Sequence, residues 1–404
     1  MTALIWAILG CVSTPKVSTP AADVNTAVHR YEEGKLRRMA TVAYRPVVPT
    51  SEEGKWLVSA LPRAQWDAAL SSAAGELISS LRTADRLMSP RAMADATARS
   101  GFPGAARFGK TITNGAFPSN LVDPIVTAAQ GASVDVGIAK RAFANGQVLW
   151  VIGWAPHLMD MDPLPRTVPL DSGVTVRVDR VTKGNARLFI APPDGPVAEL
   201  SMTSGVARWV DGFDVPGEYR FEVVAEENGQ GRVALLFSVF ADMQPPRMPT
   251  APEPPRAAPD PRAAEAYLFD ELNTLRRSHG LRPVEPFPLF DRFTREHSAL
   301  MGHTGVVAHN LPGYGTVEKR AAAFAHPRAE HHQNVAGAPS AKDALAMVRL
   351  SPAHLKNLLC ERCTHASIGA SLEPVLDRIP RLFVTWELLE FPQGPPREID
   401  DYNR

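Results

Sequence analysis

The pattern of apolar and polar residues predicts a run of β-strands in the middle of the chain. Between residues 165 and 243, segments such as "GVTVRVDRV", "ARLFIA", "GEYRFEVVAEE" and "RVALLFSVFA" alternate apolar with polar positions. The turn-like sequences "KGN", "PPDGP" and "ENGQG" separate them. Short alternating strands at this spacing are typical of a β-sandwich, and we expect one of immunoglobulin-like form.

Residues 51–164 combine both periodicities. The sequence "QWDAALSSAAGELISSLRTADRL" predicts a helix with one apolar face, formed by Trp66, Leu70, Ala73, Leu77 and Leu81. The sequence "SVDVGIAKRAFANGQVLWVIGWAP" predicts two strands joined by a turn at "FANGQ". We therefore expect a mixed α/β domain before the sandwich.

Proline marks the clearest boundary, because eight of the nineteen positions in residues 244–262 are proline. Such a stretch predicts an extended, semi-rigid linker. Residues 263–392 then form a separate C-terminal domain, followed by a tail at 393–404. Two amphipathic helices are predicted at its start, the first with Leu268, Leu272 and Leu275 at helical spacing and the second with Phe293 and His297.

The first residues, "MTALIWAILGC", form an uncharged apolar run that ends in a cysteine. Residues 1–20 resemble a bacterial lipoprotein signal together with the start of a tether. In such a signal, Cys11 would become the lipidated N-terminus. Residues 21–50 are expected to continue the extended tether. The alternatives are a buried N-terminal helix and a misplaced start. No apolar run approaches the ~20 residues that a membrane-spanning helix needs.

Composition and cysteine content narrow the class of protein. The chain has 404 residues, of which 45% are hydrophobic and 21% charged, so most of it is globular. A formal net charge of zero argues against a nucleic-acid partner. Cys360 and Cys363 in "CERC" can close a short disulfide in an oxidising envelope. A redox or metal motif is the alternative, but the second cysteine pair of a zinc knuckle is missing.

Nine of the eleven histidines lie after residue 262, which makes the C-terminal domain the place to look for chemistry. Its ordered motifs are "ELNTLRRSHGLRPV", "EHSALM", "AHN", "QNVAG", "MVRLSPAHLKNLL", "HASIGASL" and "RLFVTWELL". Together they resemble the bacterial branch of the CAP superfamily, the SCP-like relatives of cysteine-rich secretory, antigen-five and pathogenesis-related proteins. The resemblance covers residues 263–392 and implies an α-β-α sandwich with a surface cleft. The N-terminal domain shares the strand–turn–strand pattern and is a candidate degenerate CAP-like copy.

The resemblance also implies a cleft site. His309 and His354 match the two cleft histidines of the family, in which some members bind a divalent metal. Gln333 stands where the family has glutamate. Because glutamine is neutral, we expect His309 and His354 to bind Zn²⁺ only weakly, and no other cofactor is expected. Glu330 would restore a carboxylate only if the backbone turned it inward. No catalytic residue is identified.

The expected fold class is thus multidomain α+β, and the leading function is that of an exported, lipid-anchored protein of a bacterial envelope. Its CAP-like domain would bind a lipid, a peptide or another envelope protein, and the N-terminal lipid would attach it to the membrane. One alternative is a metal-dependent hydrolase that uses His309 and His354, and another is a structural or adhesive surface protein. An enzyme is not favoured, because no activity is common to the family.

Overall fold

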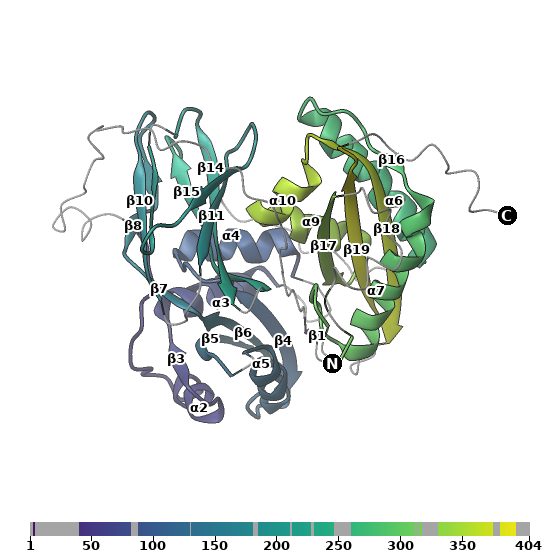
Figure 1. The fold of residues 1–404 in the computed structure, drawn as a ribbon. Coiled ribbons are helices and arrows are strands. Elements are labelled where there is room, and N and C mark those ends of the chain that lie inside the picture. The colour runs from purple at the N-terminus through teal and green to yellow at the C-terminus, as the bar shows by residue number, and fades with distance from the viewer. Residues whose placement is uncertain are drawn as a thin grey trace. The chain divides into compact units, whose positions relative to one another are not determined.

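The computed structural model describes residues 3–4, 40–81, 88–129, 131–180, 185–210, 212–227, 230–245, 260–311, 313–314, 316, 330–374 and 380–392. Its fold is mixed α+β with several sheets (Figure 1). The chain forms two compact units, one mainly of residues 15–229 and 233–255 and the other mainly of residues 256–404. Their boundary falls within the predicted linker, of which residues 246–259 lie outside the described residues. No helix in the described part is long and apolar enough to cross a membrane.

The second unit is built on one four-stranded sheet of order β16-β18-β19-β17. Its elements are α6 (Pro261–Ser278), β16 (Glu285–Pro286), η2 (Pro288–Phe290), α7 (Asp291–Thr304), β17 (Glu330–Ala338), α9 (Ala341–Leu350), α10 (Pro352–Leu358), β18 (Cys363–Pro374) and β19 (Pro380–Glu390). The central strands β18 and β19 form an antiparallel hairpin, β17 pairs antiparallel with β19, and β16 pairs parallel with β18. The two predicted helices are confirmed as α6 and α7, and the motifs "HASIGASL" and "RLFVTWELL" lie in β18 and β19.

Helices cover both faces of this sheet. Side chains from α6, α9 and α10 share one core with Ile368 of β18 and Trp386 of β19. On the opposite face, Met301 of α7 packs with Val335 and Phe383. Side chains alternate between the two faces along a strand, so each strand contributes to both cores. The result is a three-layer α-β-α arrangement.

The first unit contains a second three-layer domain. Its elements are α2 (Glu52–Ala60), β3 (Ala64–Trp66), α3 (Ala68–Ser80), α4 (Pro90–Ser100), β4 (Arg107–Thr113), η1 (Ser119–Leu121), α5 (Val122–Ala129), β5 (Ser133–Ala142) and β6 (Val148–His157). Helices α3 and α4 pack on one face of the sheet, and α2 and α5 pack on the other. Trp66, expected in the helix, belongs to β3, because Asp67 caps α3 by accepting hydrogen bonds from the backbone N–H groups of Ala69 and Leu70. The hairpin predicted around "FANGQ" is confirmed as β5 and β6.

The two domains have the same arrangement. In each, a short strand pairs parallel with the first strand of a central hairpin, and a further strand pairs antiparallel with the second. A Cβ atom added to Gly369 would lie 2.3 Å from the backbone of α7 at Arg295, and one added to Gly137 would lie 2.3 Å from the backbone of α3 at Ser71. A helix therefore crosses a hairpin glycine at close approach in both domains.

Eight further strands of the first unit, in the region of the predicted sandwich, form two sheets. These are β7 (Met159–Met161), β9 (Thr167–Val168), β10 (Val174–Arg180), β11 (Ala186–Ala191), β12 (Ala198–Ser201), β13 (Val206–Trp209), β14 (Gly217–Glu227) and β15 (Gln230–Ala241). They make one sheet of order β13-β10-β7 and another of order β12-β11-β14-β15-β9, and both sheets line one core. The hydroxyl of Tyr219 accepts from the backbone N–H of Val215 at 3.1 Å and donates to Oδ1 of Asp214 at 2.9 Å, and these contacts fix the start of β14.

Three domain limits differ from the sequence-based ones. The sandwich takes in β7, which begins before residue 165. Residues 41–42, expected in the tether, form β2 (Thr41–Val42) and pair with β8 (Leu164–Pro165), because Val42 is apolar and buried. Residues 3–4 of the expected signal form β1 (Ala3–Leu4) and pair with β4.

Candidate functional site

The predicted histidines His309 and His354 lie close together in the C-terminal domain. Their ring centroids are 6.5 Å apart and their planes are inclined by 11°. Both side chains are buried, with exposed fractions of 5% and 0%. His309 follows α7 in the chain, and His354 lies in the first turn of α10, so the pair joins two segments that are distant in sequence.

The local sequence fixes the position of His354. Ser351 caps α10 and accepts a hydrogen bond from the backbone N–H of His354, and Pro352 occupies the first helical position. The Ser351 hydroxyl also lies 2.6 Å from Nδ1 of His354. Asn334 donates to the carbonyl of His354, and Asn357 donates to the carbonyl of Gln333. The two asparagines therefore tie α10 to β17.

His297 supports the loop that carries His309. It is fully buried in α7, and its Nε2 lies 3.1 Å from the carbonyl oxygen of Ala308. A carbonyl can only accept, so Nε2 carries the proton and donates to it. This contact fixes the backbone directly before His309.

A hydrogen-bonded chain runs from His309 to a carboxylate. Nδ1 of His309 lies 2.7 Å from Oε1 of Gln333, and Nε2 of Gln333 donates to Oε1 of Glu387 at 2.7 Å. Because Gln333 uses its amide nitrogen on the carboxylate, its oxygen must accept from Nδ1–H of His309. In a neutral imidazole this leaves Nε2 of His309 as the basic nitrogen.

Glu387 is a site residue that the sequence analysis missed. It is fully buried on β19 and lies directly opposite Gln333 of β17. Its Oε2 also lies 3.4 Å from Nδ1 of His331. The signal for it was the run "TWELL", but its position facing Gln333 depends on the pairing register of β17 and β19, which sequence periodicity alone does not give.

A carboxylate therefore lies near the histidine pair, although Gln333 is neutral. Glu387 supplies a charge, but Gln333 stands between it and His309. Glu330 does not restore the site, because it is three residues from Gln333 and its side chain leaves the opposite face of β17. The buried set thus contains two imidazoles, one amide and one carboxylate held behind that amide.

In the described part of the N-terminal domain, the two positions that match Gln333 and Glu387 carry no polar side chain. Arg107 pairs with Trp154 in the N-terminal sheet as Asn334 pairs with Trp386 in the C-terminal one. At the next position, alanines 106 and 155 stand where the C-terminal domain has Gln333 and Glu387. Alanine offers no polar side-chain atom, so these two positions cannot form the contacts that Gln333 and Glu387 make.

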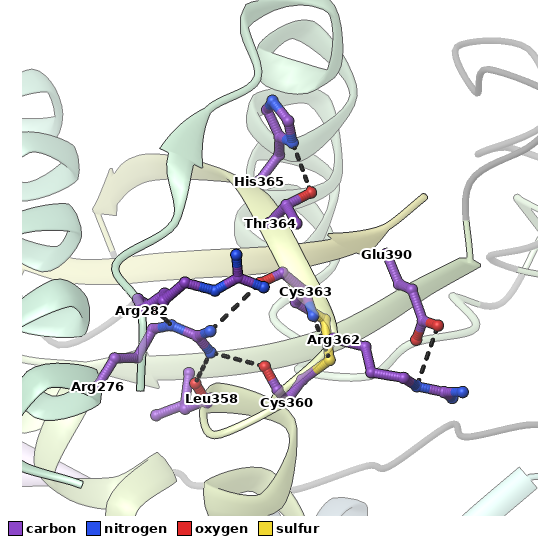
Figure 2. The surroundings of a disulfide bond; sticks show 9 residues. All are labelled: Arg276, Arg282, Leu358, Cys360, Arg362, Cys363, Thr364, His365 and Glu390. Carbon is purple, nitrogen blue, oxygen red and sulfur yellow. Dashed lines mark hydrogen bonds and ion pairs between the residues drawn. A yellow bond between two sulfur atoms is a disulfide. The ribbon is translucent and has the colours of Figure 1, made fainter. Parts of the chain in front are cut away.

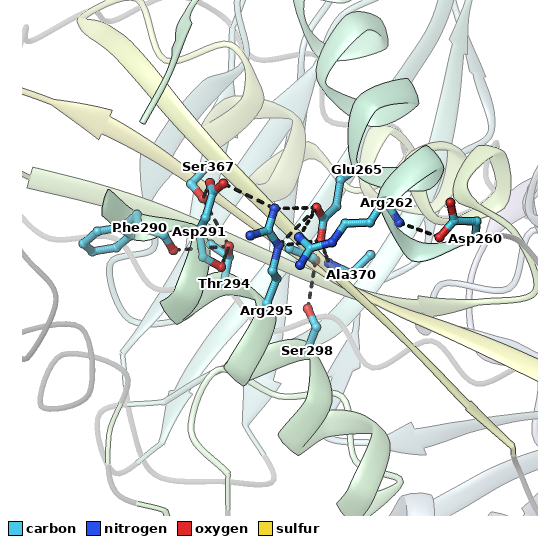
Figure 3. Close-up of polar contacts among 11 residues, drawn as sticks. Asp260, Arg262, Glu265, Phe290, Asp291, Thr294, Arg295, Ser298, Ser367 and Ala370 are labelled. Carbon is cyan, nitrogen blue, oxygen red and sulfur yellow. Dashed lines mark hydrogen bonds and ion pairs between the residues drawn. The ribbon is translucent and has the colours of Figure 1, made fainter. Parts of the chain in front are cut away.

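A buried ionic cluster holds α6, α7 and β18 together (Figure 3). Arg295 of α7 binds Glu265 of α6 through Nε at 3.0 Å and through its terminal nitrogen at 2.8 Å. The same carboxylate accepts from the backbone N–H of Ala370 at 3.0 Å. Burial raises the pKa of Glu265, and the hydrogen bond from Ala370 opposes that shift. Arg262 of α6 also binds Glu265 at 2.9 Å, so the contacts of this carboxylate link α6, α7 and β18, and we assign the cluster a structural role.

The predicted cysteine pair packs in the core formed by α6, α9 and α10, on the face of the sheet opposite the side chains of Gln333 and Glu387. Cys360 and Cys363 form a disulfide with Cα atoms 5.4 Å apart (Figure 2). His332 lies beside it, and burial lowers the pKa of its imidazole, with a smaller effect from His331. Cys11 lies outside the described residues.

Comparisons with known proteins give structural similarity only. An outer surface protein from Borrelia burgdorferi is 18% identical, with a TM-score of 0.28, over 32% of this chain and 95% of its own. An extracellular protein containing an SCP domain from Bacillus anthracis is 16% identical, with a TM-score of 0.28, over 55% of this chain and 68% of its own. A cysteine-rich secretory protein from Staphylococcus aureus is 11% identical, with a TM-score of 0.26, over 53% of this chain and 89% of its own. No protein-family model and no curated protein matches the sequence.

Proposed function

We propose that this chain is an exported, lipid-anchored envelope protein whose CAP-like C-terminal domain binds a ligand or partner at the His309–His354 pair. The observation that carries the proposal is the chain from His309 through Gln333 to Glu387. It fixes the orientation of one buried imidazole through its Nδ1 atom. The motif order and the three-layer arrangement support the CAP-like assignment, and the apolar run ending at Cys11 supports the anchor.

The same geometry argues against hydrolysis. A metal-dependent hydrolase needs an ion held by about three protein ligands and a base that reaches the attacking water. Glu387 is bound to the amide of Gln333, and that amide cannot take up a proton at neutral pH. A site of this kind positions a ligand by hydrogen bonds and shape.

Weak metal binding is a second candidate, carried by the contacts of the two Nδ1 atoms. Metal-binding histidines usually hydrogen-bond through their other nitrogen, which orients the ring. His309 does so to Gln333, and His354 to Ser351. Two neutral imidazoles would hold Zn²⁺ weakly, because stable sites use three or four ligands and often anionic ones.

Native mass spectrometry of the full chain, purified from the envelope fraction, tests the binding function. Wild type is expected to carry a bound mass that His309→Ala and His354→Ala both lose. The matched control His303→Ala, which changes a histidine at the end of α7 outside the site, should keep it. An identical profile for all four proteins would contradict the proposal. Adding Zn²⁺ to ligand-free protein, with the same variants, tests the metal candidate separately.

A further inference from the structure

A second group of metal-ligating side chains lies on the opposite face of β17 from Gln333. His332 precedes Gln333 in the strand, so its side chain leaves the other face. One imidazole nitrogen of His332 and the sulfur atoms of Cys360 and Cys363 all lie within 4.8 Å of one another. Nε2 of His332 is buried and makes no hydrogen bond within the described part of the chain. A buried polar nitrogen without a partner is unfavourable, and a metal ion would satisfy it.

The backbone around the two cysteines is held in place by contacts other than the disulfide. Arg276 is fully buried and donates to the carbonyl oxygens of Leu358 at 2.9 Å, Cys360 at 3.0 Å and Cys363 at 3.3 Å (Figure 2). The backbone N–H of Cys363 also donates to the sulfur of Cys360 at 3.1 Å. We expect both sulfurs to remain near His332 when the bond between them is broken.

We propose that the reduced pair Cys360 and Cys363 forms, with His332, a binding site for a thiophilic divalent cation such as Zn²⁺. The Cys-x-x-Cys spacing is that of zinc knuckles, with sulfur at ~2.3 Å and imidazole nitrogen at ~2.0–2.1 Å from the ion. Two sulfurs at that distance stand roughly 3.8 Å apart in a tetrahedral site, so opening the disulfide brings them toward the required separation. Cys360 and His332 are partly exposed, which leaves a fourth position for solvent.

The site is available in one oxidation state. A dithiol reductant transfers two electrons and two protons, so the bond between Cys360 and Cys363 breaks, two thiols form, and the reductant closes its own disulfide. Zn²⁺ then displaces the two thiol protons, and the two thiolates balance its charge. Oxidation removes both anionic ligands and releases the ion.

Co²⁺ titration of the full chain tests this site directly. The Cys11→Ser variant is used, so that Cys360 and Cys363 are the only thiols. After anaerobic reduction by a water-soluble phosphine, which offers no competing thiolate, we expect one equivalent of Co²⁺ to give a thiolate-to-metal charge-transfer band. Zn²⁺ should then displace the Co²⁺, and the oxidised protein should give no band.

Variants separate His332 from its neighbours. In the same background, His332→Ala should weaken Co²⁺ binding at least tenfold. The matched control His331→Ala should bind normally, because that side chain faces Glu387 on the other side of the strand. His354→Ala should keep the band, which excludes the histidine pair as its source. No band in the reduced protein, or equal binding by His332→Ala and His331→Ala, overturns the proposal. The oxidised and reduced forms of one protein are compared in any case, so a variant that fails to fold does not remove the test.

Discussion

Replacing Gln333 by glutamate tests the buried chain that ends at Glu387. The substitution puts a second carboxyl oxygen where the amide nitrogen now lies, 2.7 Å from Oε1 of Glu387. Two unit charges at that distance repel by about 6 kcal/mol at an effective dielectric constant of about 20. The introduced carboxyl will therefore take up a proton, because its neutral form can donate to Glu387 and accept from His309 as the amide does.

The loss of stability follows from that proton. An unfolded glutamate titrates near pH ~4.3, and each pH unit above it adds about 1.4 kcal/mol to the free energy of keeping the folded group neutral. The pKa of the introduced carboxyl is raised in the folded state. The loss of folding stability is therefore absent below the unfolded pKa of ~4.3 and grows as pH rises above it. At pH 7 it reaches at most about 3.7 kcal/mol.

Hydrogen exchange of the β17 and β19 amides, measured between pH 5 and pH 7 and corrected for the intrinsic exchange rate at each pH, reads this loss locally. Gln333→Glu should lose protection with rising pH, and Zn²⁺ should restore part of it by supplying a positive charge. A matched double variant that also carries Glu387→Gln should show little pH dependence. Wild-type protection for Gln333→Glu at pH 7 would show that Gln333 and Glu387 are not in contact, and our account of the site would be wrong.

Three further predictions concern other parts of the chain. Nδ1 of His157 lies 2.8 Å from Oδ2 of Asp135, and this hydrogen bond raises the pKa of the imidazole. The stability that this pair contributes should be present below pH ~6.5 and be lost as pH rises through the raised pKa. NMR titration of Asp135→Asn should show a lower pKa for His157. Gly369→Ala should destabilise by roughly 1–3 kcal/mol in chemical denaturation through overlap with the α7 backbone, whereas Gly75→Ala, in open space on α3, should stabilise by up to about 1 kcal/mol. Cys11→Ser should move the protein out of the membrane fraction, and recovery there with an uncleaved N-terminus would show that Cys11 does not anchor the chain.

Local patterns predicted the elements better than their contacts. The "FANGQ" hairpin and the C-terminal helices follow from periodicity and turn chemistry over a few residues. Helix α4 was not predicted, although Ser89 and Pro90 provide a capping residue and a first helical position. The signal was present, but an alanine-rich segment such as "AMADATA" has too few large apolar side chains to show a clear helical face.

The site residues show the same limit. His309 and His354 were found because ordered motifs pointed to them. Glu387 was missed because its place beside Gln333 depends on the register of two strands separated by two helices and another strand. The face of β17 from which His332 leaves could not be predicted for the same reason, since the face of each side chain is known only once the pairing of the strand is known.

The close approach of a helix at Gly137 and Gly369 uses residues other than the polar side chains of the site, so the two sets of residues can change independently. Each glycine admits a helix backbone against the hairpin, and neither contributes a functional group. The polar side chains of Gln333 and Glu387 lie one strand pair away, and the N-terminal domain makes the same helix contact with alanines at residues 106 and 155. The helix contact therefore does not depend on the polar side chains of the site. We expect homologous sequences to vary freely at the polar positions and to retain glycine at the two crossings.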